Sequence, residues 1–306
     1  MKNAISVVIP SYNHEKYIYD SVMSVVNQSV LPVEIIIVDD GSTDKTVDIC
    51  KKIRAQYPIV RIFEQENQGA HNALNRGIEL AQGEYVAILN SDDLFLLHKI
   101  KTCIELIKDN PKIEFFVHSV DFIDENSKKL TKGIAIDWYN RAWEFYRKSQ
   151  LLGLSLLNEN FVVTTSNMFF LKKFWEQVTG FQPLRYCHDL EFLLAASRNV
   201  DKFVVQQQSL TQYRVHPTNT IKENVRRVRV EIAAVIAQAI IEGKGNLLDI
   251  DAPESLVLFR KFLRNKNLSD LVLFFIMQYL RSEDKTTFYN NILPDRVKDN
   301  CAQLLD

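Results

Sequence analysis

The stretch Val33-Glu34-Ile35-Ile36-Ile37-Val38-Asp39-Asp40-Gly41-Ser42 joins an apolar run to an acidic turn. The run at residues 33–38 is mostly β-branched, which predicts a strand buried on both faces of a sheet. Adjacent carboxylates at the end of such a strand are costly unless they are solvated or used. We therefore expect a buried sheet with an acidic loop at the carboxyl end of this strand.

Short apolar strands alternate with helical patterns on both sides of this stretch. Strands are predicted at residues 5–9, 60–63, 84–89 and 113–120, and helices at residues 17–26, 44–56, 69–81 and 96–108. This alternation predicts an α/β fold with a mostly parallel, Rossmann-like sheet flanked by helices. Because such sheets bind ligands at the carboxyl ends of their strands, the polar loops at residues 10–13, 39–40 and 90–93 are expected to meet at one edge.

The second half of the chain is predicted to be less regular and then helical. We expect a helix at residues 137–157, a strand at 164–171, a helix at 188–198, and one or two strands at 203–215. Beyond residue 217, helical spacing predicts helices at residues 225–239, 255–263 and 269–280. The sequence thus predicts a helical C-terminal extension over residues 219–306.

Composition excludes several classes of protein. The 306 residues include 37 basic and 38 acidic side chains, so no basic excess indicates nucleic-acid binding. The four cysteines are far apart and predict reduced thiols in a cytoplasmic protein. Residues 5–10 have the pattern of a strand, so no signal peptide is expected at this end. The longest apolar run, residues 271–277, is much shorter than the about 20 residues of a membrane span.

The acidic loops suggest a ligand that carries both a nucleoside and phosphates. Asp40 could accept hydrogen bonds from a nucleobase or a ribose hydroxyl, although the same turn also suits a helix cap. Asp92 and Asp93 suit a divalent cation that holds phosphate oxygens, or else one of them caps the next helix. Tyr12 either stacks on a base or packs in its loop.

Several motifs, taken in order, resemble those of family-2 glycosyltransferases. They read VIPSYN at residues 8–13, VDDGSTD at 38–44, NQG at 67–69 with Asn72, Asn75 and Gly77, and GEY at 83–85 leading to LNSDD at 89–93. The resemblance implies the A-type nucleotide-sugar-binding glycosyltransferase fold. It also implies a catalytic domain over residues 1–218, with a nucleotide-sugar half at 1–120 and an acceptor half at 121–218.

The resemblance carries over to individual residues. It implies donor binding by Pro10, Tyr12, Asp40, Asn72, Asn90, Asp92 and Arg214. It implies a manganese or magnesium ion held by Asp93, Asp92 and His216, with Asp189 as the catalytic base. Two positions depart from the pattern: Asn90 stands where many members have Asp, and His188 stands where many have Glu. Which of Asp92 and Asp93 binds the cation is left open, and His216 and Asp189 also fit purely structural roles.

The resemblance implies an inverting, metal-dependent hexosyltransferase that uses a nucleoside-diphosphate sugar and a carbohydrate or lipid-linked acceptor. We expect the base of the donor to be uridine. Such an enzyme would act in polysaccharide or glycolipid biosynthesis. The alternative is a catalytically silent binding or scaffold protein on the same fold. A nicotinamide dehydrogenase is excluded because the chain has no GxGxxG. Lys222, Arg226, Arg227 and Arg229 either form a solvated helix face or contact the inner, anionic face of a membrane.

Overall fold

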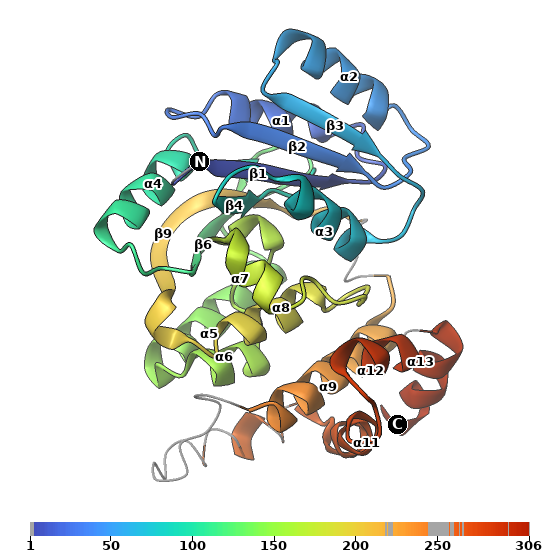
Figure 1. The fold of residues 1–306 in the computed structure, drawn as a ribbon. Helices are drawn as coiled ribbons and strands as arrows, with labels where there is room; N and C mark the ends of the chain where they lie inside the picture. Colours follow the sequence, from blue (N-terminus) through green and yellow to red (C-terminus); the bar gives the residue numbers. More distant parts are fainter. Residues whose placement is uncertain are drawn as a thin grey trace. The chain divides into compact units, whose positions relative to one another are not determined.

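The structure is a computed structural model that describes residues 3–217, 219, 223–243, 257, 260–262, 264, 266–292 and 294–305. Backbone contacts divide the chain into two compact units (Figure 1). The first contains the described residues of Met1–Gly133, Val162–Phe181 and Asp201–His216, and the second those of Ile134–Phe161, Gln182–Val200 and Pro217–Asp306. The second unit combines segments from both sides of residue 218, so the predicted division of the sequence at that residue stays a prediction.

The first unit is built on a nine-stranded sheet. Its strands are β1 (Ile5–Ser11), β2 (Glu34–Asp39), β3 (Val60–Glu64), β4 (Tyr85–Ile88), β5 (Leu94–Phe95), β6 (Phe115–Ile123), β7 (Lys129–Leu130), β8 (Phe169–Leu171) and β9 (Phe203–Arg214). The strand order is β3-β2-β1-β4-β8-β6-β9-β5, with β7 paired to β6. Strands β3, β2, β1 and β4 are mutually parallel, as are β6 and β9.

The direction of β8 decides where the polar loops lie. Strand β8 runs antiparallel to both β4 and β6, so β6 runs in the same direction as β4. The carboxyl ends of β1, β2, β4, β6 and β9 therefore lie at the same edge of the sheet. This arrangement confirms the mostly parallel sheet predicted from the sequence and brings its polar loops together.

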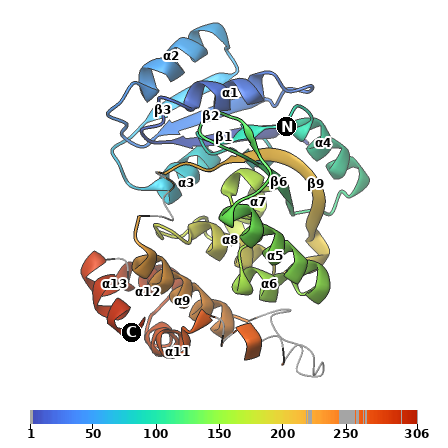
Figure 2. The same ribbon diagram turned by 180° about the vertical axis from the view of Figure 1, so that it is seen from behind.

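Helices cover both faces of the β1–β4 half of the sheet. Helices α1 (Ile18–Val26) and α2 (Thr46–Gln56) lie on one face, and α3 (Ala70–Leu80) lies on the other (Figures 1 and 2). Side chains of α1, α2 and α4 (Lys99–Asp109) share one apolar core with Ile35 and Ile37 of β2. On the opposite face, a Cβ at Gly77 would lie 2.4 Å from Val8 Cγ1, so glycine permits the close approach of α3 to β1.

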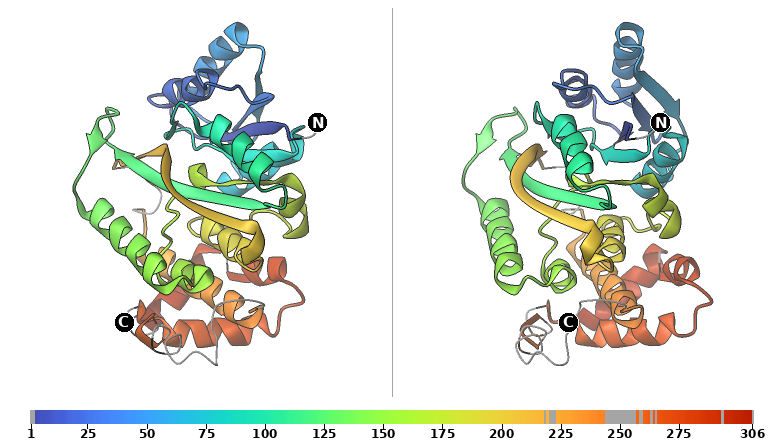
Figure 3. Two further views of the ribbon diagram at one scale, coloured as in Figure 1. Left: turned by 90° about the vertical axis from the view of Figure 1, so that its left-hand side faces the viewer. Right: turned by 60° about the vertical axis from the view of Figure 1, so that its left-hand side comes forward.

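Strands β6 and β9 form a long, bent pair. The segment predicted as one or two strands is the single strand β9, which curves strongly beside β6 (Figure 3). Their register shifts between His118 and Ser119 and again between Ser119 and Val120. Such irregularities bend a strand. The predicted strand at residues 164–171 is shorter than expected, because Thr165–Asn167 forms a 3₁₀ turn before β8.

The described part of the second unit is helical. Its helices are α5 (Ile134–Ser149), α6 (Leu152–Asn158), α8 (His188–Ala196), α9 (Val225–Ile241), α11 (Ser269–Tyr279), α12 (Lys285–Ile292) and α13 (Asp295–Cys301), and α7 (Lys172–Gln177) follows β8 in the first unit. Contacts join α5 to α6, α6 to α8, α8 to α9, and α9 to α11 and α13 (Figure 2). The prediction of one helix at residues 137–157 is wrong, because Gln150 adopts a φ of 54° and separates α5 from α6.

Two further expectations concern the chain as a whole. All four cysteines are free and buried, as the sequence predicts for reduced thiols. Among the described helices, none combines the length and the apolar character that crossing a membrane would require.

Lys222 and most of the helix predicted at residues 255–263 lie outside the described residues. Of the four cations considered for membrane contact, Arg227 forms ion pairs with Asp295 and Asp299 of the same chain at 2.8 Å.

Candidate functional site

Asp40 lies at the carboxyl end of β2 and organises the loop that follows β3. One carboxylate oxygen accepts hydrogen bonds from Gln65 Nε2 at 2.8 Å and from the Gln68 N–H at 2.9 Å. The other oxygen accepts the Gly69 N–H at 2.8 Å. Only 3% of Asp40 is exposed, and these donors meet the cost of burying its charge. The predicted contact between Asp40 and a donor base stays a prediction.

Tyr12 follows β1 at the same edge and presents its ring to solvent. The side-chain oxygen of Asn13 accepts the Thr43 N–H at 2.8 Å, and the Asn13 N–H donates to Ser42 Oγ at 2.8 Å. These bonds join the loops after β1 and β2, while Tyr12 remains 46% exposed. Pro10 lies within β1. An exposed aromatic ring beside two ordered loops is suited to stacking on a planar base.

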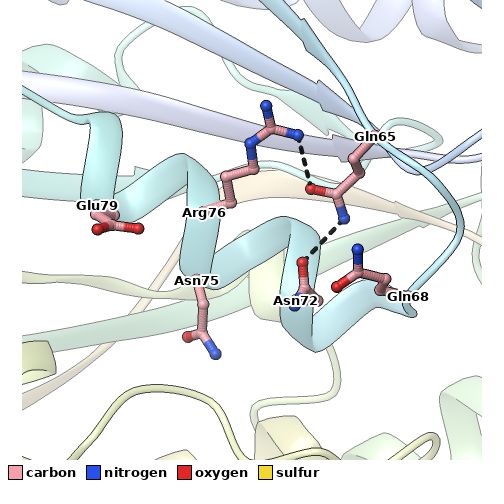
Figure 4. A pocket seen from close by; sticks show the side chains of 6 residues that line it. All are labelled: Gln65, Gln68, Asn72, Asn75, Arg76 and Glu79. Atoms are coloured by element: carbon pink, nitrogen blue, oxygen red, sulfur yellow. Dashed lines mark hydrogen bonds between the residues drawn. The ribbon is translucent and has the colours of Figure 1, made fainter.

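Asn72 faces a polar pocket of about 420 Å³ on α3 (Figure 4). The pocket is lined by Gln65, Gln68, Asn72, Asn75, Arg76 and Glu79. Gln65 joins it to the β2 loop, because its amide nitrogen donates both to Asp40 and, at 3.0 Å, to Asn72 Oδ1. Amide groups of this kind can donate to and accept from ribose and base atoms, whereas the Arg76 guanidinium can only donate to them.

Asn90 connects the end of β4 to the 3₁₀ turn before β8. Its side-chain nitrogen donates to Thr164 Oγ1 at 3.0 Å, and its side-chain oxygen accepts the Thr165 hydroxyl at 2.7 Å. An ionised aspartate could not make the first of these bonds, because it has no donor. This explains in physical terms why Asn is suited to this position, whereas its predicted contact with the donor stays a prediction.

Asp93 is enclosed by donors of the fold. One oxygen accepts the Arg214 N–H at 2.9 Å, and the other accepts the hydroxyls of Thr164 at 2.9 Å and Ser166 at 2.6 Å. Burial, followed by the neighbouring charge of Asp92, raises the pKa of Asp93 to about 8. The Asp93 side chain thereby joins the end of β4 to the 3₁₀ turn and to β9.

Asp92 points to a different group of residues, two histidines. Its carboxylate lies 2.9 Å from His216 Nε2, and potential ligand atoms of His14, Asp92 and His216 all lie within 4.8 Å of one another. His14 also contacts Ser91 Oγ through Nδ1 at 2.7 Å. Burial alone would raise the pKa of Asp92, but the His216 hydrogen bond and the nearby histidine charges lower it below its usual value.

This cluster fits a divalent cation. Two imidazoles and one carboxylate supply borderline nitrogen and hard oxygen ligands, and three protein ligands leave coordination positions open for phosphate oxygens. Asp92 and His216 were predicted as ligands, whereas His14 was not. A signal for His14 was present, since it follows the polar loop after β1 at the edge where the other loops meet.

Arg214, at the end of β9, holds the surrounding loops. Its Nε donates to the Asp92 carbonyl at 2.7 Å, and its Nη1 donates to the Asp124 carbonyl at 3.0 Å and to Ser127 Oγ at 2.9 Å. The guanidinium lies over the Tyr17 ring, with Cζ 4.8 Å from the ring centroid. The predicted donor residue Arg214 therefore supplies a fixed positive charge to the loop that carries Asp92.

Asp189 belongs to the second unit, whereas the other predicted site residues belong to the first. It is the second residue of α8, where the helix N-terminus favours negative charge. Its carboxylate accepts Asn160 Nδ2 at 2.9 Å and the Leu190 N–H at 2.7 Å. Burial raises the pKa of Asp189 above its usual value, against the lowering effects of His188 and these donors. Asn160 was not predicted from the sequence.

Comparison with known proteins identifies relatives of the chain. The family model described as glycosyl transferase family 2 matches residues 6–178, which is more than half of the chain. An uncharacterized glycosyltransferase of Nostoc is 30% identical over 70% of this chain and 66% of its own length. Chondroitin synthase of Escherichia coli is 32% identical over 48% of this chain, which matches only 20% of that protein's length.

Two solved structures share the fold. TarS of S. aureus in complex with UDP-GlcNAc has a TM-score of 0.58 at 17% identity, over 99% of this chain and 90% of that one. A mannosyltransferase of Pyrobaculum calidifontis in complex with GDP-Man and Mn²⁺ has a TM-score of 0.56 at 15% identity, over 98% and 84% of the two chains. The expected glycosyltransferase fold is thus confirmed, and the chain belongs to glycosyl transferase family 2.

Proposed function

We propose that this glycosyltransferase moves a sugar from a UDP-sugar to a hydroxyl of a carbohydrate or lipid-linked acceptor, with inversion at the anomeric carbon. The names of its relatives support this choice, since TarS was solved with UDP-GlcNAc and a bacterial chondroitin synthase makes a polysaccharide. We accordingly assign the enzyme to polysaccharide or glycolipid biosynthesis. The observation that carries the proposal is the cluster of His14, Asp92 and His216 at the edge that also carries Tyr12 and Asp40.

The donor nucleotide would be held by the loops at the carboxyl ends of the strands. Tyr12 offers an exposed ring for the base, and Asp40 holds the loop that borders the polar pocket containing Asn72. Pro10 lies one residue before the end of β1, and Asn90 ties the loop that leads to Asp92 to the 3₁₀ turn before β8. Arg214 adds positive charge close to the predicted diphosphate position.

We assign the cation to Asp92, His216 and His14 rather than to Asp93. The Asp93 oxygens already accept three hydrogen bonds inside the fold, whereas Asp92 faces the two histidines. A bound Mn²⁺ or Mg²⁺ would neutralise charge on the departing nucleoside diphosphate. Asp93 instead positions the loop on which Asp92 lies.

Asp189 is assigned as the general base. It would take the proton of the acceptor hydroxyl as that oxygen bonds to the anomeric carbon and the bond to the diphosphate oxygen breaks. A pKa raised by burial makes the carboxylate a better proton acceptor, and Asn160 holds one of its oxygens in a fixed direction. Inversion follows from a single displacement on the face opposite the leaving group.

One experiment tests the cation assignment. Calorimetric binding of UDP with manganese should be strong in the wild-type protein and should lose its manganese dependence in Asp92→Asn. The matched control is Asp20→Asn, which removes an exposed carboxylate from α1 and should bind as the wild type does. Manganese-dependent UDP binding of full strength in Asp92→Asn would refute the assignment.

A second experiment tests the base. Asp189→Asn should lower kcat by about 10²–10⁴-fold and leave donor affinity nearly unchanged. Glu191→Gln serves as the comparison, because Glu191 lies on the same helix, is buried and pairs with Lys285 at 3.0 Å. A normal kcat in Asp189→Asn with a reduced kcat in Glu191→Gln would move the role to Glu191.

A further inference from the structure

Glu231 on α9 is a fully buried glutamate with no part in the reaction described above. Its exposure is 0%, yet both of its oxygens receive backbone donors from one short loop. Oε1 accepts the Arg185 N–H at 3.2 Å, and Oε2 accepts the N–H groups of Tyr186 at 2.8 Å and Cys187 at 3.1 Å. Three consecutive backbone donors thus converge on one carboxylate.

Lys298 on α13 completes the site around this carboxylate. Its ammonium lies 2.5 Å from Glu231 Oε1, and 3% of the Lys298 side chain is exposed. A buried ion pair is tolerated when its remaining donors and acceptors are also satisfied, and here the three N–H groups satisfy the carboxylate. Both oxygens of Glu231 are therefore held by donors of the fold.

The loop that Glu231 holds leads directly into the helix that carries the proposed base. Cys187 is the N-cap residue of α8, and its side chain makes no capping hydrogen bond. Asp189 follows two residues later. Successive N–H groups that enclose an anion form a nest, whose backbone conformation depends on the anion. Removing the anion would deprive three backbone N–H groups of this acceptor, one of them the buried N–H of Cys187, so the loop would relax.

We propose that Glu231 is a positioning residue, which fixes the loop at residues 185–187 and thereby the start of α8 and the direction of the Asp189 carboxylate. This inference rests on the proposed function, in which Asp189 is the base. It gives the C-terminal helices a part in the reaction, because α9 supplies the anion and α13 supplies its counter-ion.

The test is Glu231→Gln in the full chain, assayed with UDP-sugar donors. Gln keeps the shape but replaces one acceptor oxygen by a donor that opposes the loop N–H groups. We expect kcat to fall about 10- to 100-fold, as small displacements of a reacting group do, with the donor KM within about twofold of wild type. Amide hydrogen exchange at residues 185–187 should become faster.

Glu242→Gln is the matched control. Glu242 adjoins the end of the same helix and accepts hydrogen bonds from Arg198, Tyr279 and Gln238, none of which belongs to residues 185–187. It should keep wild-type kcat and wild-type exchange in that loop. Glu231→Asp keeps the charge on a shorter side chain and should give an intermediate kcat.

The results separate the positioning role of Glu231 from the base assignment of Asp189. Wild-type kcat and exchange in Glu231→Gln overturn the positioning role, and if Asp189→Asn is still slow, the proposed base survives. A normal kcat in Asp189→Asn overturns the base and the positioning role together. If Glu231→Gln does not fold, the double variant Glu231→Gln, Lys298→Met removes both buried charges, and a wild-type kcat in it overturns the proposal.

Discussion

Lys99 begins α4 with its ammonium fully buried in the first unit, and this predicts a stability that depends on pH. Its Nζ contacts His118 Nε2 and lies 5.4 Å and 5.7 Å from the ring centroids of Phe95 and Phe116. His118 Nδ1 lies 2.8 Å from the Ser119 carbonyl and therefore carries the proton, so Nε2 accepts from Lys99. Burial, the main cause, lowers the pKa of Lys99 from 10.5 to about 8.

The sign and size of the effect follow from proton linkage. Between pH 8 and 10.5 the unfolded chain binds more protons at Lys99 than the folded chain does, so the free energy of unfolding rises with pH. The difference between 10.5 and about 8, at about 1.4 kcal/mol per pH unit, amounts to about 3 kcal/mol. That contribution is complete above pH 10.5 and is lost as the pH falls through about 8. At pH 7 the ammonium is charged and buried, at a cost of this size.

Lys99→Met removes the charge and also leaves His118 Nε2 without this donor, a loss of about 1 kcal/mol. The variant should therefore be more stable than wild type at pH 7 by about 1–2 kcal/mol. It should be less stable than wild type at about pH 10, where wild-type Lys99 is largely neutral. Urea unfolding followed by circular dichroism measures the difference between the two proteins, in which groups common to both cancel.

Lys101→Met is the matched control for this experiment. Lys101 lies on the same helix with 53% of its side chain exposed and forms only a 3.8 Å pair with Glu105. Its substitution should change stability by less than about 0.5 kcal/mol at every pH. A constant difference between wild type and Lys99→Met from pH 7 to pH 10 would show that the buried amine does not titrate in this range and would refute the reasoning.

Two other predictions follow from local contacts. Asn160→Ala removes a hydrogen-bond donor to the Asp189 carboxylate, so the pKa of Asp189 should rise further. The acid limb of the kcat–pH profile should then move to higher pH, and an unmoved limb would contradict the base assignment. Gly180→Ala places a Cβ 2.7 Å from Asn75 Oδ1 at a φ of +69°, and thermal unfolding should show a stability lower by about 1–3 kcal/mol. At Gly133 no atom lies within 4 Å of the added Cβ, so Gly133→Ala should lower the stability less.

The first half of the fold could be predicted from the sequence because its signals are local. Runs such as residues 34–39 are β-branched and apolar, and the helices between them repeat their apolar residues at helical spacing. The second half could not be read as well. The break between α5 and α6 requires a positive φ at residue 150, where the sequence has Gln rather than the Gly or Asn that usually indicate one. The three residues of β8 carry little signal of their own, because the strand is fixed by its antiparallel neighbours β4 and β6.

The acidic residues of the candidate site were identifiable from the sequence, but their division of labour was not. Asp92 and Asp93 are adjacent and identical in type, so the sequence alone leaves the cation ligand open. The choice depends on side chains far away in the chain, since Thr164 and Ser166 donate to Asp93 and His216 contacts Asp92. His14 joins the cluster only because the sheet places the end of β1 close to the loop after β4.

The two acidic doublets divide their partners in different ways. Asp39 ends strand β2, where successive side chains point to opposite sides, so Asp39 and Asp40 meet different partners. Asp92 and Asp93 instead lie in a turn, which the Asp93 N–H closes by donating to the Asn90 carbonyl at 3.1 Å. Asp39 accepts hydrogen bonds from Ser11 and Ser42, whereas Asp40 accepts donors from the loop after β3. In the first doublet both carboxylates accept donors of the fold, whereas in the second only Asp93 is enclosed by such donors and Asp92 faces the two histidines. We therefore expect replacement of Asp93 to disturb the site through its loop, and replacement of Asp92 to disturb it through loss of a proposed cation ligand.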